Sequence, residues 1–187
     1  MVYAPTTDLD AALVLGTAAG DQAAFEKLFR RFERPLYAYF TRLVKDQATA
    51  EDLVCETLTA VWKGARGFRG DARVSTWVFG IAHRIGATAI RAKRPSVSLE
   101  EIEEPIAGGS LEEEGERMDL AARIRQAMAR LSPEHQEVVE LVFYHGFAYL
   151  EIARILGVPV NTVKTRMFYA RQKLRAAFET AGITDAV

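Results

Sequence analysis

The chain has 187 residues, of which 49% are hydrophobic and 26% charged, and its net charge is −1; this length fits one domain or two small ones. No stretch approaches the roughly 20 uninterrupted apolar residues of a membrane span, and the N-terminus lacks the basic-then-apolar order of a secretion signal, so we expect a cytoplasmic protein. The single cysteine, Cys55, excludes an intrachain disulfide and a cysteine-based metal cluster.

Residues 9–94 predict a helical unit, because apolar residues recur at helical spacing and no strand or β-turn pattern interrupts them. Pro35 lies inside the first long apolar run and is a place where that helix can kink. Asp46 or Thr49 can cap the next helix, which Gly64 ends. The expected helices cover about residues 25–44, 46–64 and 75–94.

An acidic linker follows at residues 95–116. It contains two prolines, a Gly-Gly pair, eight glutamates and no lysine or arginine. The net charge of −1 is therefore the sum of −8 in the linker and +7 in the rest of the chain. This composition is typical of a flexible connector between two basic units.

Residues 117–182 predict a second helical unit of four helices. Ser132 precedes a proline and can cap one of them. The run YLEIARILGVPV has the pattern of a helix-turn-helix, in which Ala153 lets two helices approach and Gly157 can take the positive φ of a turn. The fold class that we predict is all-α, with two small helical domains joined by the acidic linker.

The segment after this turn, Asn161 to Arg175, carries five basic and no acidic side chains. At roughly 100° per residue, Val163, Met167 and Ala170 fall on one stripe, and the opposite face stays free to contact DNA. Phosphate contacts position a protein and base contacts specify its sequence, so this pattern is typical of a DNA-reading helix. An ordinary basic surface helix is the alternative. The candidate DNA-binding residues are Asn161, Thr162, Lys164, Thr165, Arg166, Phe168, Tyr169 and Arg171.

A second basic region spans Lys63 to Arg94, with eight lysine or arginine residues against one acid, Asp71. Trp77 adds an aromatic ring to these cations, and single-stranded nucleic acid requires both stacking and charge. The alternative is that Trp77 is a core residue at the start of a helix. The candidate residues in this region are Arg73, Trp77, Arg84, Thr88 and Arg91.

Two basic helical units joined by an acidic linker, the second with a helix-turn-helix, resemble the extracytoplasmic-function (ECF) sigma factors of bacterial RNA polymerase. Three segments carry the resemblance: AEDLVCETLTAVW (50–62) is similar to region 2.2, STWVFGIAHRIGATAIRAKR (75–94) to regions 2.3 and 2.4, and residues 131–175 to region 4. The helix-turn-helix alone is shared by many regulators, whereas all three segments in this order and spacing are highly specific.

The resemblance implies a factor that binds core RNA polymerase and directs promoter recognition, DNA melting and the start of transcription. Residues 50–62 would bind the clamp helices of the β′ subunit through Asp52, Glu56 and Thr57. Regions 2.3 and 2.4 would open and read the −10 element, with loop 67–75 holding a flipped base, and region 4 would read the −35 element and dock on the β flap. The resemblance also implies an anti-sigma factor as partner, no enzymatic activity and no cofactor.

Three positions depart from the family pattern. Tyr169 stands where an arginine often sits, and Arg84 and Thr88 stand where many members carry Asn and Asn or Asp. An arginine suits guanine or phosphate and an amide suits adenine, so the promoter sequences of the family do not transfer to this chain.

The remaining polar residues support weaker inferences. Cys55 lies beside the apolar stripe of its helix and is expected to be a small buried thiol. His83, His135 and His145 lack metal-ligand spacing, so we assign them no metal and no chemistry. The alternative function is a helix-turn-helix regulator that works without polymerase; such proteins usually dimerise, and the sequence shows no obvious dimerisation helix.

Overall fold

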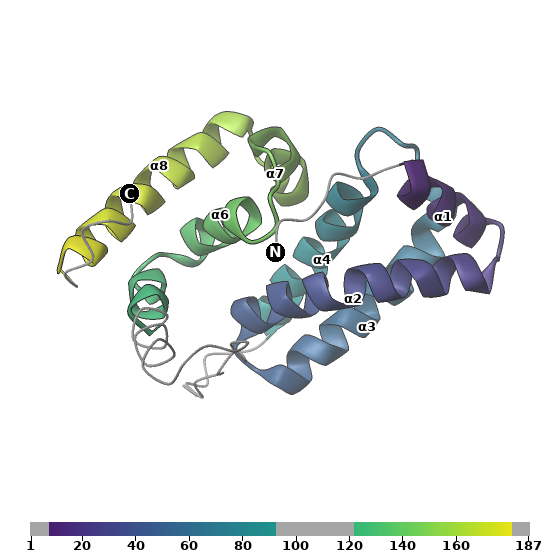
Figure 1. Ribbon diagram of the computed structural model, residues 1–187, viewed down its shortest axis with the longest axis horizontal. Coiled ribbons are helices and arrows are strands. Elements are labelled where there is room, and N and C mark those ends of the chain that lie inside the picture. The colour runs from purple at the N-terminus through teal and green to yellow at the C-terminus, as the bar shows by residue number, and fades with distance from the viewer. Residues whose placement is uncertain (1–7, 93–121, 181–187) are drawn as a thin grey trace, which may run out of the picture.

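The computed structural model describes residues 8–92 and 122–180, and within these ranges the chain contains helices and no strand. Figure 1 shows two groups, one formed by α1 to α4 and the other by α6 to α8 with a short helix at 122–129. The all-α prediction is confirmed, and the expected linker at 95–116 lies outside the described residues. The bounds are α1 Asp8–Ala18, α2 Gln22–Val44, α3 Gln47–Gly64, η1 (a 3-10 turn) Ala65–Gly67, α4 Val74–Ala92, α6 Pro133–Phe143, α7 Tyr149–Leu156 and α8 Val160–Thr180.

Local signals set several helix ends as the sequence predicts. Of the two residues that could cap α3, Asp46 is the N-cap, and its carboxylate accepts a hydrogen bond from the backbone N–H of Thr49 at 2.9 Å. α3 ends at Gly64, and Gly157 follows α7 with a φ of 65°. α2 runs as one helix through Pro35.

The core of the first group lies between α2, α3 and α4. Phe32, Leu36 and Phe40 recur one turn apart on α2 and are fully buried. α1 is tied to α2 by an ion pair, because the buried carboxylate of Asp10 lies 2.7 Å from Nε of Arg31. The aromatic residues of α2 therefore supply much of the core on which the other helices pack.

The second group contains the predicted helix-turn-helix. Val163, Met167 and Ala170 of α8 are all buried, as their spacing predicts. They face α6 and α7, where Leu141 and Ile152 are also buried. This packing fixes which side of α8 remains open to solvent.

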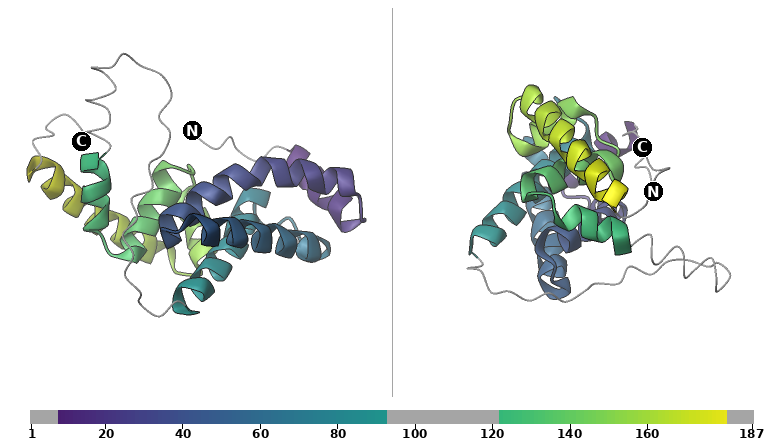
Figure 2. Two further views of the ribbon diagram at one scale, coloured as in Figure 1. Left: turned by 90° about the horizontal axis from the view of Figure 1, so that it is seen from below. Right: turned by 90° about the vertical axis from the view of Figure 1, so that its left-hand side faces the viewer.

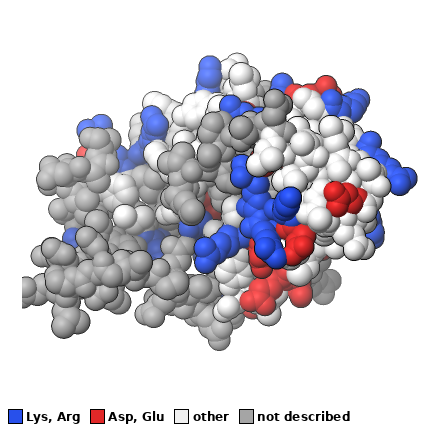
Figure 3. All heavy atoms as spheres, turned by 45° about the vertical axis from the view of Figure 1, so that its right-hand side comes forward, with Lys and Arg blue, Asp and Glu red and all other residues white. Residues whose placement is uncertain are grey.

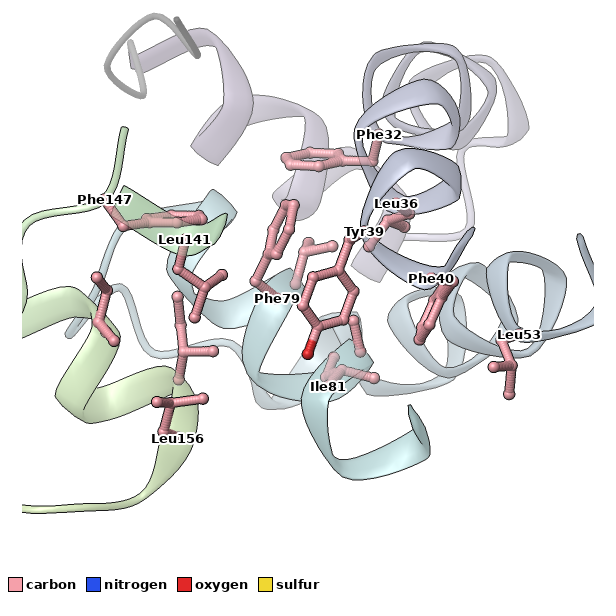
Figure 4. Close-up of a cluster of buried hydrophobic side chains, with 14 of the residues drawn as sticks. Phe32, Leu36, Tyr39, Phe40, Leu53, Phe79, Ile81, Leu141, Phe147 and Leu156 are labelled. Atoms are coloured by element: carbon pink, nitrogen blue, oxygen red, sulfur yellow. The ribbon is translucent and has the colours of Figure 1, made fainter. Parts of the chain in front are cut away.

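The two groups of helices pack against each other, with α4 and α7 side by side (Figures 1 and 2). Phe79 of α4 contacts the ring of Phe147 at a centroid distance of 5.0 Å and that of His145 at 4.7 Å. Figure 4 shows Phe79 between Tyr39 on α2 and the side chains of Leu141 and Phe147. One hydrophobic core therefore extends through both groups.

Candidate nucleic-acid interface

α8 presents the predicted DNA-reading face to solvent. Its buried stripe faces α6 and α7, so the polar and aromatic side chains point the other way. Phe168 and Tyr169 remain 60% and 49% exposed, although both are large aromatic residues. Among the candidate residues, those exposed are Asn161, Lys164, Thr165, Phe168, Tyr169 and Arg171, and those half-buried are Thr162 and Arg166.

The start of α6 lies against this face and orders its aromatic residues. The ring of His135 meets Tyr169 edge-on, with centroids 6.5 Å apart, and Tyr169 meets Phe168 at 5.5 Å. Nδ1 of His135 lies 2.5 Å from the hydroxyl of Ser132, which holds the imidazole in place. Tyr169 is thus supported from two sides while its exposed part remains available to a ligand.

The basic residues of α8 differ in their electrostatic surroundings. The pKa of Glu134 is lowered, first by a hydrogen bond from its own backbone N–H and then by a hydrogen bond from the side chain of Ser132. The charge of Arg166 lowers this pKa by a smaller amount. Arg166 therefore has an acidic neighbour inside the protein. Within residues 8–92 and 122–180, Lys164 and Arg171 form no ion pair, so their charges are available to phosphates.

A second candidate surface runs along α4. Arg84, Thr88 and Arg91 are exposed on successive turns of this helix. The hydroxyl of Thr88 donates to the backbone carbonyl of Arg84 at 2.9 Å, and Nε of Arg91 donates to the carbonyl of Ala87 at 3.1 Å. The flank therefore presents two guanidinium groups and a hydroxyl in a row.

A hollow of about 290 Å³ opens beside the N-terminal half of α4. Loop 67–72 forms one wall, and Trp77, Gly80 and Arg84 contribute to another. The Trp77 ring is half-buried and lies 5.0 Å from the ring of Phe68. Trp77 thus combines the two roles considered from the sequence, because it packs against the core and also lines an open hollow.

The polymerase-binding residues predicted on α3 separate into exposed and buried positions. Asp52 and Glu56 are exposed, but Thr57 is completely buried, so the prediction that Thr57 contacts a partner is wrong. Thr57 lies four residues from Leu53 and from Val61, both buried, and it therefore faces the same side of the helix.

Cys55 is a second correction, because it is exposed rather than buried. Each residue of a helix is rotated by about 100° from the one before it. Cys55 therefore points away from the core, which the preceding residues Leu53 and Val54 face. It instead shares the outer face with Asp52 and Thr59, three and four residues away.

Two known sequence families match the chain: Sigma-70 region 2 over residues 28–95 and Sigma-70 region 4 over residues 121–174. The ECF RNA polymerase sigma factor SigM of Mycobacterium tuberculosis is 33% identical over 171 residues, which cover 88% of this chain and 82% of SigM. The chain belongs to the ECF RNA polymerase sigma factors. The ECF RNA polymerase sigma factor SigW of Bacillus subtilis is 28% identical, and the match covers 83% of this chain and 89% of SigW.

Solved structures of this family have the same fold. CnrH, determined in complex with the cytosolic domain of CnrY, has a TM-score of 0.69 and 25% identity, with 92% of this chain and 98% of CnrH covered. The sigma factor RpoE of Bartonella quintana has a TM-score of 0.64 and 22% identity, with 87% of this chain and 98% of RpoE covered. The chain is therefore a promoter-recognition factor of RNA polymerase, with helical regions 2 and 4.

The segments of this sigma factor that match regions 2 and 4 are joined by polar contacts that the sequence did not predict. The Tyr39 hydroxyl donates to Oε1 of Glu137 at 2.6 Å, and Nδ1 of His83 lies 2.7 Å from the same oxygen. Arg42 pairs with the buried carboxylate of Glu140 at 3.2 Å. Three residues of α2 and α4 therefore contact two carboxylates of α6.

A second set of contacts joins α7 to the candidate −10 surface. Oε1 of Glu151 lies 3.5 Å from Nε of Arg73 and accepts a hydrogen bond from the Thr76 hydroxyl at 3.3 Å. Arg154 donates to the backbone carbonyl of Asp71 at 3.0 Å and lines the hollow. Figure 3 shows basic and acidic side chains gathered side by side on one face of the molecule.

Neither a metal-binding cluster nor a membrane-spanning helix occurs in the described residues of this sigma factor. No three His, Cys, Asp or Glu side chains gather there in a way that would hold a metal ion. None of the helices in residues 8–92 and 122–180 is long and apolar enough to cross a membrane.

Proposed function

We propose that this sigma factor reads its promoter with the two exposed basic surfaces, α8 for the −35 element and α4 with loop 67–72 for the −10 element. The observation that supports this most strongly is the position of Trp77, a half-buried aromatic residue that lines a hollow together with Arg84. A flipped or unstacked base requires such a ring together with nearby cations. The −10 residues are Arg73, Trp77, Arg84, Thr88 and Arg91.

α8 acts in the major groove of duplex DNA. Its exposed polar face supplies base contacts, and Lys164 and Arg171 supply phosphate contacts. Tyr169 presents an aromatic ring where an arginine would contact guanine, which changes the −35 sequence that is preferred. The −35 residues are Asn161, Thr162, Lys164, Thr165, Arg166, Phe168, Tyr169 and Arg171.

Core polymerase binds through α3 and through region 4. Asp52 and Glu56 are exposed carboxylates one turn apart on α3, suited to basic residues of the β′ clamp helices. Region 4 docks on the β flap. In this scheme residues 9–94 form the region 2 domain, 95–116 the linker and 117–182 the region 4 domain.

Three further properties accompany this function. The factor acts in the cytoplasm, where core polymerase is found, and polymerase forms the phosphodiester bonds, so the chain needs no catalytic residues and no cofactor. An anti-sigma factor holds the free chain; the similar factor CnrH was determined with a protein bound to it, the cytosolic domain of CnrY.

Run-off transcription tests the proposal. Core polymerase is incubated, with and without the chain, with a library in which each promoter is linked to its own transcribed barcode, and the barcodes found in the transcripts identify the selected −10 and −35 elements. We expect transcripts that depend on the chain, a one-to-one complex with core, and loss of the −10 preference on Trp77→Ala. A dimer that binds duplex DNA without core, and no transcript that depends on the chain, would instead identify a polymerase-independent regulator.

A further inference from the structure

Two exposed aromatic rings lie side by side on the face of α8 that we assign to −35 DNA. Phe168 is 60% exposed and Tyr169 is 49% exposed, and their ring centroids are 5.5 Å apart. At about 100° per residue, the two rings project on opposite sides of the line through Thr165 and Gln172, which point away from the buried stripe of α8. Apolar surface therefore occupies the middle of a face whose edges carry lysine and arginine.

The ring of Tyr169 is held by α6 as well as by its neighbour on α8. His135 meets it at an interplanar angle of 82°, with centroids 6.5 Å apart, which is within the range of favourable aromatic pairs. The hydroxyl of Ser132 lies 2.5 Å from Nδ1 of His135 and so fixes the imidazole in turn. These contacts restrict the rotamers of Tyr169, so less conformational entropy is lost when its ring binds a ligand.

The charges on this flank of α8 do not favour a phosphate as the ligand of Tyr169. The pKa of Glu134 is lowered, first by a hydrogen bond from its own backbone N–H, so this carboxylate is ionised at neutral pH. It interacts with the charge of Arg166, three residues before Tyr169, and it repels phosphate oxygens. Lys164 and Arg171 lie on the other flank of the helix. Tyr169 is therefore placed to contact base edges rather than the DNA backbone.

The edges of the bases in the major groove offer one apolar group to such a ring. Every base presents hydrogen-bond donors or acceptors there, and thymine alone adds a C5-methyl group. An arginine at residue 169 would bind O6 and N7 of guanine, whereas the ring of a tyrosine gains most by removing a methyl group from water. The chemistry of Tyr169 thus favours an A·T pair whose methyl group faces the ring.

We propose that Tyr169 sets the −35 specificity of this sigma factor by contacting the methyl group of a thymine, and that His135 holds its ring in place. The proposal rests on the −35 role of α8 proposed above. Tyr169 is the specificity-determining residue, since it touches the base. His135 is a positioning residue that acts through Tyr169, and the phenol hydroxyl is not needed for the contact.

Selection from the barcoded promoter library by the complex with core polymerase tests the assignment to Tyr169. We expect the wild type to select a thymine, on either strand, at a −35 position where Tyr169→Arg selects guanine. Lys173→Ala, an exposed residue one turn further along the same flank, is the control and should keep the thymine. An unchanged selection by Tyr169→Arg, or no thymine at the position that changes, would overturn the proposal. A wild type that selects no −35 element would also overturn the promoter-reading role of α8.

Replacement of the selected thymine by deoxyuridine tests the methyl contact itself, because it removes the methyl group and keeps every hydrogen-bonding group. The wild-type complex should bind the thymine promoter about fourfold more tightly than the deoxyuridine promoter, as expected for one buried methyl group. Tyr169→Phe should keep this ratio of affinities, and Tyr169→Ala should lower it to about one. A ratio near one in the wild type, with the −35 element still selected, would refute the methyl contact alone. A ratio that is lost in Tyr169→Phe would assign the reading to the hydroxyl and would refute it too.

The same ratio tests His135, because a general loss of stability affects the binding of both promoters equally. His135→Ala should lower the ratio towards one, and His135→Phe, which keeps a ring against Tyr169, should restore it. A wild-type ratio in His135→Ala would exclude the positioning role. Affinity for core polymerase is measured in parallel for Tyr169→Ala. A fall in this affinity with an unchanged thymine-to-deoxyuridine ratio would show that the ring contacts the polymerase, and would overturn the proposal.

Discussion

The hydroxyl of Tyr39 on α2 donates a hydrogen bond of 2.6 Å to Oε1 of Glu137 on α6, and the tyrosine side chain is 1% exposed. The donor belongs to the helices that match region 2 and the acceptor to those that match region 4. Burial raises the pKa of Tyr39 well above its ordinary value of 10.0, and the charge of Glu137 raises it further. The hydroxyl therefore stays protonated in the folded protein at pH values where a solvated tyrosine ionises.

The raised pKa of Tyr39 predicts a loss of stability in alkali. Above about pH 10 the unfolded chain releases the Tyr39 proton and the folded chain keeps it, so the folded state binds more protons and the free energy of unfolding falls as pH rises. Tyr39→Phe should reduce this fall, as measured by urea unfolding between pH 8 and 11. Tyr37→Phe on the same helix is the control, and an identical pH dependence in both variants would contradict the prediction.

Gly86 allows α4 to approach α2 closely. A Cβ atom there would lie 2.6 Å from Cδ2 of Leu43 and 3.3 Å from Cε1 of Phe40. Leu43 is half-buried and can move, but the Phe40 ring is fully buried. Gly86→Ala should therefore lower the free energy of unfolding by about 1 kcal/mol, because overpacking costs more than the gain in helix propensity.

Gly80 supplies the matched control on the same helix, because a Cβ atom there would meet nothing within 4 Å. Gly80→Ala should raise the free energy of unfolding by up to about 1 kcal/mol through helix propensity alone. Both variants are compared by chemical denaturation. Changes of the same sign would show that close packing at residue 86 does not limit stability.

The exposed carboxylate of Asp52 predicts a contact with core polymerase. Asp52→Arg should weaken core binding by at least about tenfold, since a like charge at an interface costs on the order of several kcal/mol. Thr57→Val, a buried change of similar shape on the same helix, should leave the affinity nearly unchanged. Fluorescence titration of labelled protein with core provides both values, and a normal affinity of Asp52→Arg would remove Asp52 from the interface.

The free charge of Lys164 predicts a phosphate contact at the −35 element. Lys164→Ala should weaken binding of the polymerase complex to promoter DNA and reduce the slope of log affinity against log salt by about 0.9. Lys27→Ala, an exposed lysine of α2, should leave this slope unchanged. A slope that Lys164→Ala does not change would exclude the phosphate contact.

The local features of this protein follow from its sequence. The spacing of Val163, Met167 and Ala170 predicted the buried side of α8, and Asp46 and Gly157 marked a helix start and a turn. Helix periodicity and caps act over a few residues, so a single sequence contains them in full. Periodicity also places Thr57 with Leu53 and Val61; its assignment to a partner came from the family resemblance and was wrong.

The arrangement of the two helical groups was decided by tertiary structure alone. Nothing near Glu137 or Glu151 in the sequence indicates that their partners are Tyr39 and Arg73, because either glutamate would be equally stable in water on its own helix. Their roles depend on apolar faces such as that of Phe79, which bury whatever polar groups lie at their edges. Burial then requires partners, and which residues can serve as partners depends on how the helices pack.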